Sequence, residues 1–217
     1  MEVCWGGHNK EQTIGIRVRS SDATVADLLE VWQSLAEDTR VRKKYAGPGL
    51  VCRGCQSNCC SNPFVIPDLI AIKQMADHLS MSYSVLIDTY CCPHHRQKGL
   101  LKLKSEPCIF LQDNLCTIYP YRSLTCRFYL CSSLLGETEQ IIYSIAWTGI
   151  AAAWIFARQE GIISGPAHGT HRPGRGSFEQ ICLDLIAKYS RSPNVDLFLN
   201  ACQYSHIPLK PFLSSEQ

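Results

Sequence analysis

The sequence predicts a mostly α-helical protein with a small antiparallel β-hairpin and a cysteine-rich metal-binding core flanked by helices. Three observations lead to this prediction. Apolar residues recur every three or four positions in several segments, which is the period of amphipathic helices. Two short apolar runs on either side of Gln112-Asp113-Asn114 are typical of a hairpin. Ten of the thirteen cysteines lie between Cys52 and Cys131.

The N-terminal region, residues 1–50, is predicted to form a strand and a helix that pack on the core. Residues 13–18 alternate apolar and polar side chains, as a half-buried strand does. A Ser-Ser-Asp sequence at residues 20–22 then provides side-chain oxygens that cap a helix, which we expect over residues 24–45. One face of this helix is apolar, through Val25, Leu28, Leu29, Trp32, Leu35 and Ala36.

The central region, residues 51–135, is predicted to be the cysteine-cluster metal-binding domain. Its regular elements follow from apolar periodicity and from turn residues. In chain order we expect a helix from Pro67 to Leu79, a short helix over 82–90, a strand over 99–104, a hairpin with strands at 108–111 and 115–119, and a helical turn over 122–129.

The C-terminal region, residues 136–217, is predicted to be helical and to form one structural unit with the core. The expected helices cover 139–158, 177–189 and 194–203, with a loop rich in Gly, Pro and His at 161–176. The uncharged stretch from Ile141 to Ala157 has 17 residues. As a helix it spans only about 25 Å, less than the roughly 30 Å hydrocarbon core of a bilayer. We therefore expect a buried core helix and no membrane.

The composition indicates the cellular compartment and the classes of partner that we expect. A chain of 217 residues, of which 46% are hydrophobic, can bury a sizeable core without crosslinks. The N-terminus has no basic segment followed by an apolar one, so no secretory signal is predicted. An odd number of cysteines also argues against a disulfide framework, and we expect a cytoplasmic protein. With a net charge of +2 and no long basic run, no nucleic-acid partner is expected.

The first cysteine group lies at residues 52–60. Cys52 and Cys55 are separated by two residues, a spacing that lets two thiolates reach one metal, and it is compatible with zinc, an iron–sulfur cluster or redox chemistry. Cys59 and Cys60 follow directly. Because adjacent residues rarely direct both side chains to one point, we expect one of them to bind the primary centre. The other reaches a second metal or packs as a buried thiol.

The second group comprises Cys108, Cys116, Cys126 and Cys131. The predicted hairpin places Cys108 on one strand and Cys116 on its partner, close enough to bracket one site. Thiolates are soft ligands that suit zinc, copper(I) or iron–sulfur clusters. Arg122 and Arg127 lie among these cysteines. A guanidinium there would offset the negative charge of several thiolates, but both arginines could equally be ordinary surface residues.

The segments CRGCQSNCC (Cys52–Cys60) and CIFLQDNLCTIYPYRSLTCR (Cys108–Arg127) resemble the YkgJ-type cysteine-cluster proteins, a family described as zinc- or iron-chelating. That family pairs a CxxCxxxCC-like cluster with a later C-P-F-L…C-x-I-Y-x-x-R-P-x-x-C-R segment. Ile109 and Ser123 stand where it favours proline, and neither departure removes a ligand. The resemblance implies seven ligands, namely Cys52, Cys55, Cys59, Cys60, Cys108, Cys116 and Cys126. Cys131 lies just beyond the motif.

The same cysteine pattern occurs in flagellin lysine-N-methylases, which are thought to use an iron–sulfur centre and S-adenosylmethionine. This chain looks too short to carry that whole enzyme. It also lacks a Gly-rich turn after a strand, which would indicate a nucleotide or S-adenosylmethionine pocket. The enzymatic interpretation is therefore an alternative only.

Several other residues are weaker candidates. Cys91-Cys92-Pro93-His94-His95 is an accessory metal site or, at least as well supported, the packing of a helix end. His168 and His171 lie in the Gly/Pro loop, where exposed polar residues are the commoner explanation than metal capture or substrate contact. Cys182 and Cys202 fall on apolar helix faces and are expected to be buried thiols.

Three functions remain open from the residues alone. The first is an iron protein, with an iron–sulfur cluster or a small iron site, that has a redox or electron-transfer role and a redox partner. The second is a structural zinc module that presents its helices to a protein partner. The third is an iron–sulfur-dependent modifying enzyme whose open ligand position faces the loop of His168 and His171. Eight candidate ligands favour a cluster or two sites, because one structural zinc takes four.

Overall fold

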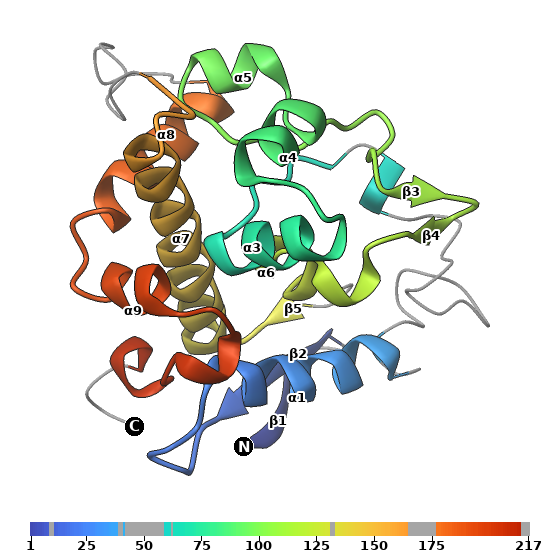
Figure 1. Ribbon diagram of the computed structural model, residues 1–217. Coiled ribbons are helices and arrows are strands. Elements are labelled where there is room, and N and C mark those ends of the chain that lie inside the picture. Colours follow the sequence, from blue (N-terminus) through green and yellow to red (C-terminus); the bar gives the residue numbers. More distant parts are fainter. Residues whose placement is uncertain are drawn as a thin grey trace.

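The computed structural model describes residues 1–8, 11–38, 41, 59–61, 63–130, 133–164 and 177–213 (Figure 1). Helices dominate this part of the chain, as the sequence predicts. Five predicted site residues lie outside the described residues: Cys52, Cys55, Cys131, His168 and His171. The same holds for the side chain of Cys59.

The helices begin where the sequence offers capping side chains. Thr24 and Asp27 form a reciprocal capping box at the start of the first helix, and Asp68, Ser82 and Ser177 each accept a hydrogen bond from an amide of the first turn of the helix that follows. The helices are α1 (Val25–Glu37), α3 (Leu69–His78), α4 (Tyr83–Tyr90), α5 (Pro93–Gln97), α6 (Leu124–Arg127), α7 (Gly136–Gln159), α8 (Phe178–Tyr189) and α9 (Val195–Asn200). Short 3₁₀ helices are η1 (Cys59–Ser61), η2 (Tyr119–Tyr121), η3 (Tyr204–His206) and η4 (Lys210–Phe212).

The predicted hairpin is present, in a shorter form. Strand β3 (Leu111–Gln112) pairs antiparallel with β4 (Leu115–Cys116), and Leu111 lies opposite Cys116. The two residues between the strands, Asp113 and Asn114, have φ values of 49° and 60°. Asp and Asn tolerate this left-handed conformation better than most residues do, and a two-residue turn of this kind matches the twist of the strands.

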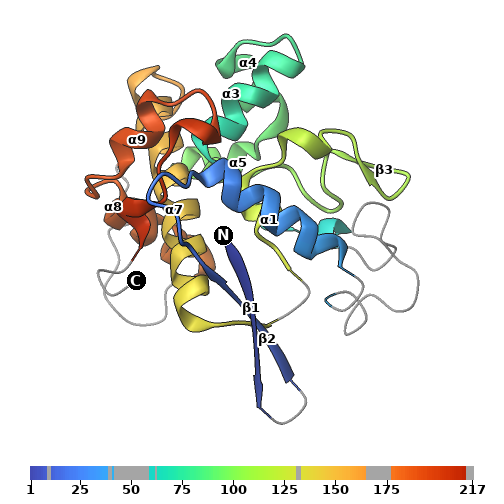
Figure 2. The ribbon, with the colours of Figure 1, turned by 90° about the horizontal axis from the view of Figure 1, so that it is seen from below.

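A second sheet differs from the prediction. Strand β1 (Glu2–His8) pairs antiparallel with β2 (Glu11–Arg17), and β5 (Ser133–Leu134) adds to β2 in parallel. The sequence predicts only the middle strand of these three. Figure 2 shows the β1–β2 pair projecting away from the helices.

The strand predicted over 99–104 is wrong. This segment forms only an isolated bridge between Cys91 and Leu103. Its apolar residues Leu100, Leu101 and Leu103 are all buried, and its backbone bonds go to separate segments, for example from Leu103 N to Val65 O. An extended apolar segment therefore crosses the core without joining a ladder.

Helix α7 is the central helix of the fold and packs against α3, α8, α9 and β2. Figure 1 shows it running the length of the molecule between α3 and the C-terminal helices. By length and composition it could cross a bilayer, but 61% of its apolar window is buried inside the protein. Small residues on its surface, Ala151, Ala152 and Ala153, are completely buried and let neighbouring helices approach closely. This agrees with the core helix that the sequence predicts.

Gly149 marks the tightest contact of α7. A Cβ atom at this position would lie 2.8 Å from Cβ of Asp68 and 2.8 Å from Cε1 of Phe198. Both neighbours are buried, so neither can move aside easily.

We expect Gly149→Ala to lower the free energy of unfolding by about 1–3 kcal/mol, because the added methyl group overpacks the contact with Asp68 and Phe198. This loss outweighs the gain of about 1 kcal/mol in helix propensity. Urea unfolding measures the difference. The matched control is Gly136→Ala in the same helix, where nothing lies within 4 Å of the added carbon. Equal stability of the two variants would contradict the close contact.

Candidate metal centre

Four of the predicted ligands come from three segments: η1, the β3–β4 hairpin with the residues before it, and α6. Cys60 lies in η1, Cys108 precedes β3, Cys116 ends β4 and Cys126 lies in α6. The amide of Cys108 donates a 3.0 Å hydrogen bond to the carbonyl oxygen of Cys60, which ties η1 to the start of the hairpin. In Figure 1 the short teal helix that holds Cys60 lies next to β3. A backbone hydrogen bond thus holds together two cysteines that are 48 positions apart in the sequence.

The four thiols also influence one another electrostatically. Burial is the main cause that raises the pKa of Cys126 to about 12, and negative charge on Cys60 and Cys108 raises it further. Burial likewise raises the pKa of Cys116, with contributions in the same direction from Cys108 and Cys60. Four acidic groups that disfavour each other's ionisation in a half-buried place form a site that a cation would stabilise.

Hydrogen-bond donors point at three of the sulfur atoms. The backbone amide of Phe110 bonds the sulfur of Cys108, and the amide of Ile118 bonds that of Cys116, two residues further along in each case. The hydroxyl of Ser123 donates to Sγ of Cys126 at 3.6 Å. Each bond favours the thiolate over the thiol. Alone they do not overcome burial, so an additional positive charge is needed to ionise the group.

Arg122 supplies part of that charge. Its positive charge lowers the pKa of both Cys116 and Cys126. The guanidinium is held in place because Nε donates to Tyr119 O at 2.9 Å and Nη2 donates to Gln33 Oε1 at 3.2 Å. It also stacks 3.6 Å from the ring centroid of Tyr119. These contacts are compatible with the first of the two roles that the sequence leaves open, in which Arg122 offsets thiolate charge.

The donor set fits a soft metal, although the described part does not complete a coordination sphere. Within residues 59–61, 63–130 and the other described ranges, no group of three His, Cys, Asp or Glu side chains is compact enough to hold an ion. Charges influence one another over distances longer than a metal–sulfur bond of about 2.3 Å. The cysteines can therefore affect one another's pKa without being close enough to hold an ion. Cys52, Cys55, Cys59 and Cys131 remain predicted ligands.

Comparison with known proteins bears on this site directly. Residues 51–146 match the family model named CxxCxxCC, described as "Putative zinc- or iron-chelating domain". Residues 51–146 are therefore similar to this family of domains. The match includes all eight predicted ligands and agrees with the resemblance found in the sequence. Comparison with curated proteins and with solved structures gives no significant match. The family supports metal binding, with zinc or iron as the metal.

Helix α6, which carries Cys126, has only four residues and is held by hydrogen bonds to residues distant in sequence. Its first amide, Leu124 N, donates to Oδ2 of Asp68 at 2.8 Å. Just beyond its end, the carbonyl oxygen of Phe128 accepts from Nε1 of Trp32 at 3.0 Å. A helix this short has no stability of its own, so these contacts fix where Cys126 lies.

Asp68 is the main anchor among these contacts. It is almost fully buried, and its carboxylate accepts from the amides of Ala71 and Leu124 and from the hydroxyl of Tyr204, at 3.1, 2.8 and 3.0 Å. Burial raises the pKa of the Asp68 carboxyl, although these bonds favour the anion. The sequence predicts that a helix begins at Pro67, and Asp68 is the residue that caps it. Its bonds to Leu124 and Tyr204 leave no local sequence signal.

The accessory site at Cys91–His95 is not supported. Cys91 donates to Leu101 O at 3.7 Å, and burial raises its pKa to about 12. Nε2 of His95 pairs with Glu179 at 3.0 Å. These contacts agree with helix-end packing, the better supported of the two explanations.

Of the two cysteines predicted to be buried thiols, one is buried and the other is not. Cys182 is buried, as predicted, and burial raises its pKa to about 11. Cys202 is exposed, so that prediction is wrong. Helix α9 ends at Asn200 rather than at residue 203, so Cys202 does not lie on a helix face at all.

We expect Asp68→Ala to lower the free energy of unfolding by about 2–4 kcal/mol, because the buried amide of Leu124 and the hydroxyl of Tyr204 both lose their acceptor. Tyr204→Phe removes a single donor and is expected to cost about 1 kcal/mol. Denaturant titration measures both. The control is Asp77→Ala, an exposed residue of the same helix, with an expected change within about 0.5 kcal/mol. A similar loss in the control would show that Asp68 has no special role.

Proposed function

We propose that this protein holds iron through cysteines of two segments, as an iron–sulfur cluster such as 4Fe-4S or a small iron site, and that it serves electron transfer with a redox partner. The observation that carries the proposal is the approach of Cys60, Cys108, Cys116 and Cys126, with backbone amides bonded to two of the sulfurs. Such thiols stay reduced in the cytoplasm, which is the compartment we propose.

Two features favour iron over a single zinc. Eight predicted cysteine ligands exceed the four of one structural zinc site. Hydrogen bonds to sulfur and a nearby positive charge are also the means by which proteins adjust the reduction potential of an iron–sulfur cluster. A cluster, when bound, would exchange one electron at a time. Phe110, Ile118 and Arg122 would then stabilise the more negative state.

A structural zinc site is the second candidate, and a specific observation favours it. Four cysteines, the number that one zinc takes, influence one another electrostatically in the described part, and Cys108 and Cys116 lie on the two sides of a tight hairpin turn. In that case the metal would fix η1, the hairpin and α6 relative to one another. The helices would be available to a protein partner.

Anaerobic purification separates the two candidates. Absorbance, iron, zinc and acid-labile sulfide are measured on the same sample. A brown protein with iron and sulfide supports the cluster and rejects the zinc module. A colourless protein with stoichiometric zinc rejects the cluster.

We expect Cys116→Ser to lose most of the bound metal and to lower the thermal unfolding temperature together, because ligation and folding are linked. Metal analysis and thermal unfolding measure the two effects. Cys202→Ser is the matched control, since that thiol is exposed and outside both cysteine groups. It is expected to keep metal and stability. If Cys116→Ser keeps full metal content, the hairpin does not supply a ligand.

A further inference from the structure

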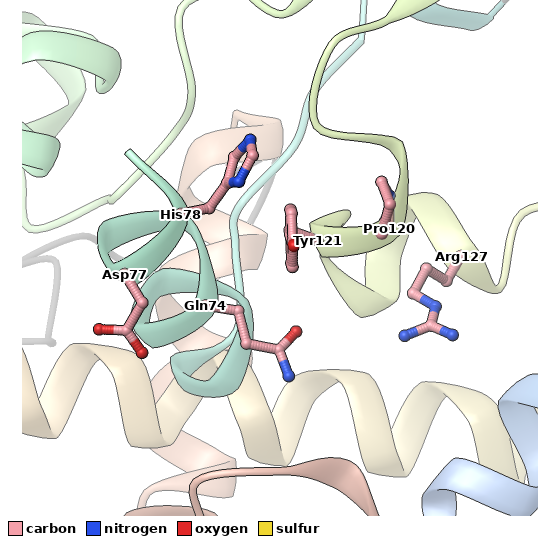
Figure 3. Close-up of a pocket in the computed structure, with 6 residues that line it drawn as sticks. All are labelled: Gln74, Asp77, His78, Pro120, Tyr121 and Arg127. Atoms are coloured by element: carbon pink, nitrogen blue, oxygen red, sulfur yellow. The ribbon is translucent and has the colours of Figure 1, made fainter. Parts of the chain in front are cut away.

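A pocket of about 370 Å³ opens between α3 and the segment that joins the hairpin to α6. Gln74, Asp77 and His78 come from α3, and Pro120, Tyr121 and Arg127 come from η2 and α6 (Figure 3). None of the six is a predicted metal ligand. The pocket is therefore a separate feature of the surface, and a ligand could bind there whether or not the cysteines hold a metal.

Arg127 is the cationic side chain of this pocket. It is half-buried, and its Cζ lies 5.5 Å from the ring centroid of Tyr204. Among the described residues, its guanidinium has no hydrogen bond or ion pair with any acceptor, in contrast to Arg122, which has two bonds. A guanidinium carries five N–H donors in a planar fork that matches a carboxylate or a phosphate.

The acidic groups near Arg127 are already engaged or turned away. Burial lowers the pKa of Arg127, and charge on Tyr204 and on Asp68 acts in the opposite direction. The oxygens of Asp68 already accept from Ala71, Leu124 and Tyr204. Figure 3 shows the carboxylate of Asp77 at the opposite end of the pocket, pointing away from Arg127. Within the described residues neither carboxylate forms an ion pair with Arg127, so its N–H donors are available in the pocket.

Gln74 completes a set of donors. Its side-chain amide and the guanidinium of Arg127 extend toward one another from the two sides of the pocket (Figure 3). Figure 3 shows the ring of Tyr121 above the Gln74 amide, on the side of His78, and the centroids of the Tyr121 and His78 rings are 4.5 Å apart. An amide N–H and a guanidinium that converge beside an aromatic wall are typical of a site for an organic anion.

We propose that this pocket binds a small organic oxyanion, whose carboxylate or phosphate lies between Arg127 and Gln74 and whose body packs on Tyr121 and Pro120. The volume of about 370 Å³ is within the range of small-molecule sites and larger than a bare inorganic ion requires. Because Arg127 follows Cys126 directly, the ligand would lie beside the cysteine group.

Isotope-edited NMR tests the proposal on the full chain as purified. The side-chain signals of Arg127 Nε and of the Gln74 amide are followed while benzoate, phenyl phosphate or inorganic phosphate is added at constant ionic strength, with chloride as the control anion. The expected result is a saturable shift of both signals with benzoate or phenyl phosphate. Comparing these two probes shows whether the ligand group is a carboxylate or a phosphate.

Two variants test the donors. Gln74→Glu is nearly isosteric and places a fixed negative charge opposite Arg127, so affinity for the anion should fall at least about tenfold. Arg127→Gln should reduce it as strongly. The matched control is Gln97→Glu, which makes the same charge change on an exposed position of α5 and should leave affinity unchanged. Metal content and thermal unfolding, measured on every variant, detect any loss of the fold.

Three outcomes overturn the proposal. One is the absence of a saturable shift with both organic probes. Another is an equal affinity in Gln74→Glu and Gln97→Glu. The third is inorganic phosphate binding as tightly as phenyl phosphate, which would show that the aromatic wall contributes nothing. Because Gln74 lies outside the cysteine groups, a Gln74→Glu variant that keeps its metal but loses the anion separates this site from the metal centre.

Discussion

The buried carboxylate of Asp68 is the interaction on which the arrangement of this protein depends. It caps α3, accepts from the first amide of α6 and from Tyr204 of η3, and lies against Gly149 of α7. Four segments that are distant in sequence therefore meet at one side chain. A buried carboxylate is stable only when its oxygens are hydrogen-bonded, and leaving its donors unpaired is costly. This mutual requirement fixes α6, and with it Cys126 and Arg127, relative to the core.

The electrostatics around the cysteines follow from the same burial. Removal from water raises the pKa of Cys108, Cys116 and Cys126, while nearby amides, a hydroxyl and Arg122 act in the opposite direction. The amides, the hydroxyl and Arg122 thus favour the thiolate form in part, and a bound cation would supply the rest of the stabilisation that ionisation needs. The two arginines of the motif have different surroundings: Arg122 is hydrogen-bonded to Tyr119 and Gln33, whereas Arg127 faces a pocket.

Local signals in the sequence predicted local structure well. The turn at Asp113-Asn114 indicated the hairpin, and the helices predicted from Pro67 and from residue 82 begin within two residues of those positions, because turns and caps act over a few residues. Features that depend on a distant partner were missed. Strand β1 forms by pairing with β2, the extended segment 99–104 binds to several neighbours, and Asp68 reaches a tyrosine 136 positions away. Within the site, the ligands inferred from the cysteine spacing stay predictions. The closeness of Cys60 and Cys108 has no signal in the sequence, because it comes from a backbone hydrogen bond between residues 48 positions apart.

The long separation between Asp68 and Tyr204 has a consequence for how the protein is made. Synthesis proceeds from the N-terminus, at about 5–20 residues per second. Cys60, Cys108, Cys116 and Cys126 therefore leave the ribosome well before the phenol that completes the bonding of Asp68. During that interval the cysteines would be present while their support is incomplete, which exposes a nascent chain to capture of the wrong ion. A metal delivered after synthesis is complete would meet cysteines whose supporting contacts have already formed.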